Sequence, residues 1–200
     1  MKKRRLNNRE ESILSLLKKF DFMTRDQLNR YFHLGSKRNT NRVISALSDY
    51  LIHVRDGHHF IYYLNANGRA YVDCNKIRKK GSHVEHTIMR NEFYLFYSCP
   101  HDWRNEVKVS DGKATIICDA LFTKSLRYHF LEVDHTQPMS ENRMKIARYK
   151  ELHGNGLLAQ KLEHFPTIVW LTTSELRRNQ LQEACRELPL TKVYTINEIK

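Results

Sequence analysis

The stretch FLEVDHTQP, residues 130–138, decides how the second half of this chain is interpreted, because it places two carboxylates on one short apolar strand. Side chains two residues apart on a strand point to the same face, so Glu132 and Asp134 share one side while Leu131 and Val133 occupy the other. These two acids, called the acid pair below, repel each other. A sequence that keeps both beside apolar residues typically uses them to bind a metal, a proton or a positively charged partner.

The elements around this strand follow the order of an α/β fold. The patterns of apolar residues predict a helix at 83–99, strands at 103–110, 113–123 and 126–134, a helix at 139–156, a strand at 165–172, a helix at 175–188 and a last strand at 191–196. Asp111-Gly112 marks the first turn between strands. The order αβββαβαβ predicts an α/β unit around a mixed central sheet over residues 83–200.

Acidic residues on two neighbouring strands match the PD-(D/E)xK motif of the restriction-endonuclease-like fold. In that motif an Asp and a Glu hold Mg²⁺ against the scissile phosphate, and a Lys two residues after the Glu orients or activates the attacking water. Asp119 and Glu132 are the candidate metal ligands here, and Asp134 stands where the motif requires Lys. The extra negative charge repels phosphate, so the sequence favours a nuclease-like unit that has lost its chemistry.

A lysine on the following helix could replace the missing one. Lys145 and Lys150 are the candidates, and Lys145 would complete a catalytic set with Asp119, Glu132 and Asp134. Only in that case would Mg²⁺ be a cofactor. This alternative is a metal-dependent nuclease that nicks or relaxes DNA.

Two further roles for the acid pair stay open. The pair could bind Arg or Lys side chains, for example Arg143 or Arg148, and hold the sheet to the following helix. It could also take part in contact with DNA without a metal. Spacing alone does not choose between these roles.

Nearly all of the net charge belongs to the first part of the chain. Residues 1–82 contain 18 Lys and Arg against 7 Asp and Glu, a balance of +11, whereas the remaining residues contain 16 against 15, a balance of +1. A concentrated positive field favours a polyanion, and nucleic acid is the commonest one in the cytoplasm. A basic tail that only improves solubility would explain the first few residues but not the later Lys and Arg. Double-stranded DNA is therefore the expected partner.

Local signals over residues 1–80 predict a winged helix-turn-helix unit. Apolar spacing predicts a helix within 11–20, Thr24 and Gln27 form a capping box for a second, and Ser36 caps a third. Asp56-Gly57 between two apolar runs predicts a hairpin, and 65–77 a closing helix before a linker at 78–83. Three helices followed by a hairpin is the winged-helix order.

The third helix of such a unit enters the major groove, and the tip of the hairpin contacts the DNA backbone. Arg and Asn at the start of the helix suit bidentate contacts to guanine and adenine, while Lys and Thr can reach phosphates. The expected contacts are Lys37, Arg38, Thr40, Asn41 and Arg42 on the helix, and Arg55 and His58 on the hairpin. DNA binding by these residues requires no cofactor. The alternative is an ordinary solvated helix face.

Composition excludes several other classes of protein. The four cysteines are widely spaced and form no Cys-x-x-Cys pair, which argues against zinc and against a disulfide framework. No apolar run approaches the roughly 18 residues that cross a bilayer, and the start MKKRRLNNREES lacks the apolar core of a secretory signal. We therefore expect a cytoplasmic protein with no membrane partner.

Six segments together resemble the replication-relaxation family of plasmid, phage and mobile-element proteins. They are MTRDQL (23–28), HTIMRNEF (86–93), CDALF (118–122), FLEVDHTQP (130–138), KIARYKEL (145–152) and FPTIVWLT (165–172). The piece FLEVD followed by Lys145 and Tyr149 is the most specific of these. The resemblance implies a winged helix followed by a PD-(D/E)xK-like unit.

Two departures from the family pattern weaken the nuclease interpretation. Cys118 replaces a Pro that commonly precedes the Asp, and DHTQP replaces D-x-G-T-E, which removes one Glu that could act as a ligand. The resulting hypothesis is a DNA-binding protein that acts in the replication or relaxation of a mobile element, or in its control. A homodimer and other replication or transfer proteins are the further partners considered. Besides the nicking nuclease, the alternative is a transcriptional regulator whose second unit mediates dimerisation or partner binding.

Overall fold

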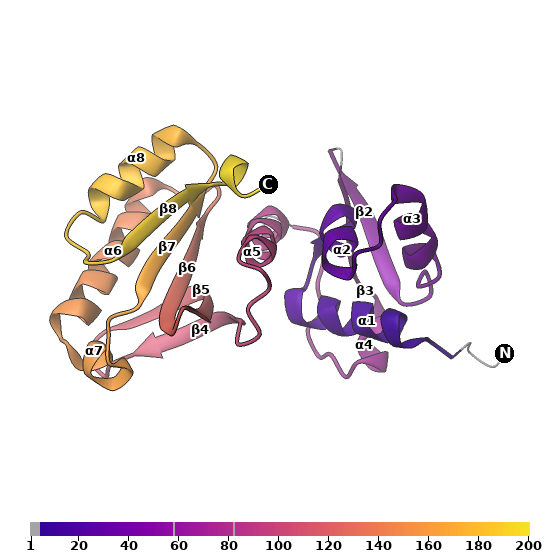
Figure 1. Ribbon diagram of the computed structural model, residues 1–200, viewed down its shortest axis with the longest axis horizontal. Helices are drawn as coiled ribbons and strands as arrows, with labels where there is room; N and C mark the ends of the chain where they lie inside the picture. Colours follow the sequence, from indigo (N-terminus) through magenta and orange to yellow (C-terminus); the bar gives the residue numbers. More distant parts are fainter. Residues whose placement is uncertain (1–4, 58, 82) are drawn as a thin grey trace. The chain divides into compact units, whose positions relative to one another are not determined.

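The computed structural model describes residues 5–57, 59–81 and 83–200, and the chain divides into two compact units, Met1–Asn91 and Glu92–Lys200 (Figure 1). Each unit has its own sheet and its own core. Among the helices of the described residues, none combines the length and the apolar character needed to cross a lipid bilayer.

The first unit consists of short helices beside a small antiparallel sheet. Its elements are α1 (Asn8–Phe20), β1 (Met23–Thr24), α2 (Arg25–Phe32), α3 (Lys37–Ser45), β2 (Leu51–Asp56), β3 (His59–Leu64) and α4 (Ala66–Tyr71). Within the described residues the sheet has the order β1-β3-β2, and Asp56 pairs with His59 at the end of the hairpin. The expected hairpin and helix order are therefore present.

Local hydrogen bonds explain where these helices begin. Thr24 and Gln27 form the expected capping box of α2, and the Ser36 side chain accepts from the backbone N–H of Asn39 at the start of α3. Such caps satisfy backbone donors that have no partner inside the helix. The starts of these two helices are thus fixed by their own sequences.

The division between the two units falls inside helix α5 (Val84–Phe96), not at the linker expected at 78–83. The Asn91 side chain donates hydrogen bonds to the backbone oxygens of Phe20 and Phe22, at 3.1 and 2.7 Å. These buried contacts attach the first half of α5 to the first unit. Apolar periodicity predicts the helix but does not reveal an attachment made by one amide.

The second unit is built on a mixed sheet. Its elements are β4 (Arg104–Ser110), β5 (Thr115–Lys124), β6 (Arg127–Asp134), α6 (Met139–Gly154), α7 (Leu157–Leu162), β7 (Thr167–Thr172), α8 (Glu175–Ala184), β8 (Thr191–Thr195) and the 3-10 turn η1 (Ile196–Glu198). In the described part of the chain the sheet has five strands in the order β4-β5-β6-β7-β8. The first two pairings are antiparallel and the last two parallel, so the expected mixed α/β fold is confirmed. The short helix α7 was not predicted.

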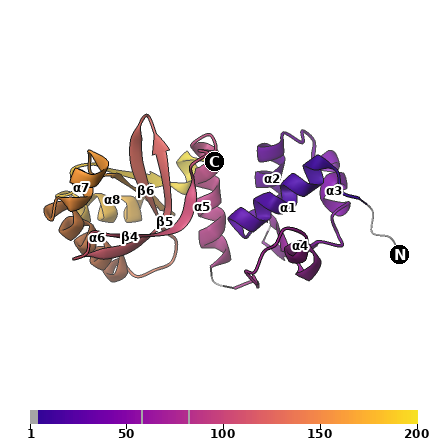
Figure 2. The ribbon, with the colours of Figure 1, turned by 90° about the horizontal axis from the view of Figure 1, so that it is seen from below.

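Helices cover both faces of this sheet. Figures 1 and 2 show α6, α7 and α8 on one side and α5 on the other. Phe93 of α5 packs its ring against Phe122 and Tyr194, while Phe130 of β6 lies beside Tyr149 of α6. Because side chains alternate along a strand, residues two and four positions after Phe130 also face α6 and α8. Those residues are the acid pair.

Candidate functional site

The acid pair lies between the sheet and helix α6. Glu132 is 1% exposed and Asp134 is fully buried. Three polar residues of α6, Asn142, Lys145 and Tyr149, face the pair because they are three and four residues apart and share one side of the helix. Burying two carboxylates is costly unless each is paired and hydrogen-bonded, so their partners define the site.

Glu132 is bound by two side chains of α6. One of its carboxylate oxygens accepts from the Lys145 ammonium group and the other from the Tyr149 hydroxyl, at 2.5 Å. Burial raises the pKa of Glu132 to about 8, although Lys145 opposes the shift, and the nearby charge of Asp119 raises it further. The charge of this carboxyl therefore depends on pH in the neutral range.

The two groups that bind Glu132 both remain donors at neutral pH. Burial alone would lower the pKa of Lys145, but the charges of Glu132 and Asp119 outweigh burial and raise it. Burial also raises the pKa of Tyr149 well above its ordinary value, and the charge of Glu132 adds to this effect. Lys145 keeps 29% of its side chain exposed, so it links the buried carboxyl to the surface.

Asp134 has a separate and denser set of partners. Arg177 of α8 binds both of its oxygens, at 2.9 Å from Nε and 2.5 Å from Nη2. Thr172 and Asn142 each donate a further hydrogen bond at 2.7 Å, and Arg177 also donates to the backbone oxygen of Gln137. Burial alone would raise the pKa of Asp134, but these hydrogen bonds, first that of Arg177, lower it below its ordinary value.

The acid pair binds one Lys and one Arg side chain, but not the two arginines named as examples from the sequence. Lys145 and Arg177 bind the acids, whereas Arg143 and Arg148 are exposed. Positions 143 and 148 do not share the stripe of α6 that faces the pair. Arg177 was missed because it follows Asp134 by 43 residues. Its place in the first turn of α8, just after the neighbouring parallel strand β7, is the signal that could have indicated it.

Asp119 binds the backbone of the neighbouring strand. The described pairs of β5 and β6 run from Lys124 and Arg127 to Ala120 and Leu131. One residue beyond the last pair, Asp119 accepts the backbone N–H of Val133 at 2.7 Å, so its carboxylate satisfies a donor of the sheet. The structure thus places Asp119, Glu132 and Lys145 close enough for their charges to act on one another.

The residues predicted to bind magnesium accept hydrogen bonds from the protein in this structure. Both oxygens of Glu132 and one of Asp119 accept hydrogen bonds from protein donors, and Asp134 is bound on both oxygens by Arg177. Mg²⁺ requires octahedral oxygen ligands. Within the described ranges no group of three or more His, Cys, Asp or Glu side chains is placed to hold a metal.

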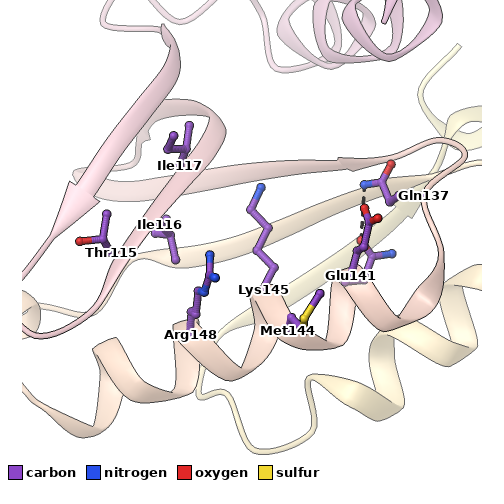
Figure 3. Close-up of a pocket in the computed structure, with 9 residues that line it drawn as sticks. Thr115, Ile116, Ile117, Gln137, Glu141, Met144, Lys145 and Arg148 are labelled. Atoms are coloured by element: carbon purple, nitrogen blue, oxygen red, sulfur yellow. Dashed lines mark hydrogen bonds between the residues drawn. The ribbon is translucent and has the colours of Figure 1, made fainter. Parts of the chain in front are cut away.

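A cleft of about 410 Å³ opens beside Lys145 (Figure 3). Its lining comes from one strand, one loop and one helix: Thr115, Ile116 and Ile117 of β5, Gln137 of the loop after β6, and Glu141, Asn142, Met144, Lys145 and Arg148 of α6. Two of these lining residues, Asn142 and Lys145, also bind the acid pair.

In the first unit, most of the residues predicted to contact DNA lie at the surface. Lys37, Arg38, Asn41 and Arg42 are exposed on α3, and Arg55 is exposed on β2. His58 lies outside the described residues.

Thr40 is the exception among the predicted contacts. It is fully buried, and its hydroxyl donates to the backbone oxygen of Ser36 at 3.0 Å. It therefore stabilises the start of α3 and is not part of the exposed face. The prediction failed because every residue of the motif was assigned to one surface, although a helix turns about 100° per residue.

Sequence reasoning also missed a cation beside this surface. Arg25, the first residue of α2, donates to the side-chain oxygen of Asn41 at 3.4 Å and lies 5.5 Å from the ring centre of Phe60. Its position just after the capping residue Thr24 was visible in the sequence. No local pattern shows that α2 begins beside α3 and the hairpin.

The family model for replication-relaxation matches residues 14–168, which is most of the chain and includes both the exposed face of α3 and the acid pair. The chain belongs to the replication-relaxation family. The suspected resemblance is thereby confirmed.

Among solved structures, the replication-relaxation protein is similar to the crystal structure of protein VC1899 from Vibrio cholerae. The two chains are 13% identical with a TM-score of 0.41, and the match covers 98% of this chain and 55% of the other. The chain thus spans about half the length of that protein. No curated protein shows significant sequence similarity to it.

Proposed function

We propose that this replication-relaxation protein binds duplex DNA through its first unit, and that its second unit has no nuclease activity. Its role would be the replication or relaxation of a mobile element, or the control of that process. The observation that best supports DNA binding is the exposed start of α3, where Lys37, Arg38, Asn41 and Arg42 all face solvent.

The arrangement of the first unit supports a winged helix. Helices α2 and α3 are followed by the β2–β3 hairpin, and β1 pairs with β3 to complete the sheet. In winged helices the helix equivalent to α3 lies in the major groove. Arg38 and Asn41 have the donor and acceptor patterns that discriminate guanine and adenine there.

Other cations around α3 suit contacts with phosphate. Arg25 lies beside Asn41, and Arg55 is exposed on the hairpin. The excess of +11 in residues 1–82 adds a long-range attraction for a polyanion. Phosphate contacts of this kind position a protein on DNA, while the base contacts select the sequence.

The absence of nuclease activity is proposed from the bonding of the acids. A nuclease of this type needs carboxylates that can hold a metal against phosphate. Here Asp134 is bound by Arg177 and Glu132 by Lys145 and Tyr149. These bonds give the acid pair a structural role that joins β6 to α6 and α8.

DNA binding is tested by selecting duplexes from a random library with the full chain and then measuring affinities for the selected site. Arg38→Ala and Asn41→Ala are each expected to weaken binding by about 1–3 kcal/mol. Ser45→Ala is the matched control, because Ser45 is exposed at the other end of α3. Equal affinities for all variants, or failure to select any site, would refute the assignment of α3.

A nuclease is the second candidate function, because Asp119, Glu132 and Lys145 are neighbours. Together they supply the Asp, Glu and Lys that the motif requires. Supercoiled plasmid is incubated with the protein in Mg²⁺, Mn²⁺ or EDTA, alongside Glu132→Gln. We expect no change in topology under any condition. A nicked or relaxed product that needs both the metal and Glu132 would establish an enzyme instead.

A further inference from the structure

The cleft beside Lys145 changes in character from one end to the other. Figure 3 shows Thr115, Ile117 and Arg148 at one end, Lys145 and Met144 further along, and Gln137 with Glu141 at the opposite end. The lining thus passes from basic and apolar side chains at one end to hydrogen-bonding and acidic ones at the other. Such a graded cleft is suited to an elongated ligand whose two ends differ.

Helix α6 sets this order through its spacing. Glu141, Met144, Lys145 and Arg148 follow one another at intervals of three, one and three residues, so they form one stripe along the helix. At 1.5 Å per residue, Glu141 and Arg148 are separated by about 10 Å along the axis. This is similar to the span between the phosphate and the far edge of the base in a nucleotide.

The basic end suits a single phosphate group. Arg148 is exposed and has no ion-pair partner among the residues that the structure describes, and a guanidinium group binds phosphate through two parallel hydrogen bonds. Lys145 adds a second cation, although its charge is partly balanced by Glu132. Glu141 at the other end would repel a second phosphate, so the charges favour one anionic group in one orientation.

The exposed apolar side chains and the acidic end of the cleft suit a nucleobase. Ile117 is 57% exposed and Met144 60% exposed, so two large apolar side chains meet water beside the cations. A base can cover such side chains with its apolar face while its edge forms hydrogen bonds. The Glu141 carboxylate accepts hydrogen bonds, and base amino and imino groups donate them.

We infer that this cleft binds one nucleotide unit, with its phosphate at Arg148, its base against Ile117 and Met144, and its edge toward Glu141 and Gln137. The ligand is a free nucleotide or an unpaired nucleotide of a single strand, because a base stacked inside a duplex cannot enter the cleft. Binding involves no metal. This site goes beyond the duplex binding proposed for the first unit and does not depend on it.

The site is tested by methyl NMR on the full chain in EDTA, following the signals of Ile117 and Met144, which are assigned with Ile117→Val and Met144→Leu. The probes are thymidine monophosphate, a thymidine pentanucleotide and an acidic peptide. We expect saturable shifts of both methyl signals with the pentanucleotide. Equal shifts with the monophosphate would identify a free nucleotide as a sufficient ligand, whereas shifts with the pentanucleotide alone would identify the single strand.

A pair of arginines on the same helix provides the control. Arg148→Ala is expected to weaken the binding measured by these shifts about tenfold. Arg143→Ala should leave it unchanged, because Arg143 is exposed but does not line the cleft. Met144→Glu, which places a charge where the base would lie, should also abolish the Ile117 shift.

Three outcomes would overturn the inference. They are the absence of a methyl shift with either nucleotide probe, an equal loss of nucleotide affinity in Arg143→Ala and Arg148→Ala, and larger shifts with the acidic peptide than with the nucleotides. The affinity of Arg148→Ala for the selected duplex keeps this test separate from the proposed function. We expect that affinity to be unchanged. The nucleotide test of the cleft and the duplex-binding test of the first unit can therefore succeed or fail independently.

Discussion

Glu132 and Asp134 are neighbours on the same face of β6, yet their surroundings shift their pKa values in opposite directions. Burial dominates at Glu132 and raises its pKa, whereas the hydrogen bonds of Arg177, Thr172 and Asn142 prevail at Asp134 and lower it. The repulsion that the sequence suggests is thus reduced, because each acid has its own cation. Sequence spacing predicted that both acids share a face, but it could not assign their partners.

The raised pKa of Glu132 makes the stability of the fold dependent on pH. The folded pKa of about 8 lies above the ordinary value of 4.5, so the folded state binds more protons than the unfolded state between these values. The contribution of Glu132 is complete below pH 4.5 and is lost as the pH rises to about 8. We expect the free energy of unfolding, measured with urea across this range, to fall less steeply in Glu132→Gln.

The unfolding free energies of Glu132→Gln are compared with those of the wild-type protein at each pH. This comparison is needed because other groups titrate in the same pH range in both proteins. Burial lowers the pKa of His129, which acts in the opposite direction, since a folded state that disfavours a proton gains stability as the pH rises. Only the difference between the two curves reports on Glu132. Parallel curves would show that the carboxyl does not titrate in this range.

The removal of Asp134 should be costly even if the acid pair has no catalytic role. Asp134→Ala leaves Arg177 and two further donors without their acceptor, and breaking a buried ion pair costs about 3–5 kcal/mol. We expect a loss near 3 kcal/mol, because the Arg177 side chain keeps 22% of its surface exposed. Asp26→Ala, which breaks an exposed pair with Arg30, is the control and should cost less than 1 kcal/mol. Equal effects in urea unfolding would contradict the buried network.

At the scale of the elements, the sequence was most informative where a few adjacent residues decide the structure. The starts of α2 and α3 and the position of the hairpin follow from Thr24, Ser36 and the turn after Asp56, and all were predicted. Helix α7 and the attachment of α5 to the first unit were not predicted. Both depend on contacts between residues distant in the sequence, which periodicity does not register.

Helix α4 contains a packing constraint that the sequence does not show. A Cβ atom at Gly68 would lie 2.2 Å from the backbone oxygen of Tyr50, so Gly68→Ala forces the backbone to move. We expect it to lower the free energy of unfolding by about 1–3 kcal/mol. A Cβ atom at Gly154, at the end of α6, would meet no atom within 4 Å, so Gly154→Ala should be neutral or stabilising by up to about 1 kcal/mol. A cost at Gly154 equal to that at Gly68 would disprove the steric explanation.

At the scale of the whole molecule, charge and chemistry are divided between the two units. The basic excess belongs to residues 1–82, and the acid pair with the neighbouring cleft belongs to residues 92–200. This division was visible in the sequence because charge can be counted along the chain. The cleft was not predicted, since it depends on α6 lying beside β5, which brings Thr115 and Ile117 near Arg148.

The division of charge gives a prediction about salt. If the first unit binds DNA, the logarithm of the affinity should fall linearly with the logarithm of salt concentration, by about 0.9 for each phosphate that the protein neutralises. Arg55→Ala should reduce this slope by about one, because the exposed guanidinium on the hairpin is expected at a phosphate. Asn41→Ala should lower the affinity at every salt concentration and leave the slope unchanged, because an uncharged base contact displaces no counterions. Arg143→Ala in the second unit should alter neither quantity, and a reduced slope there would place the phosphate contacts outside the first unit.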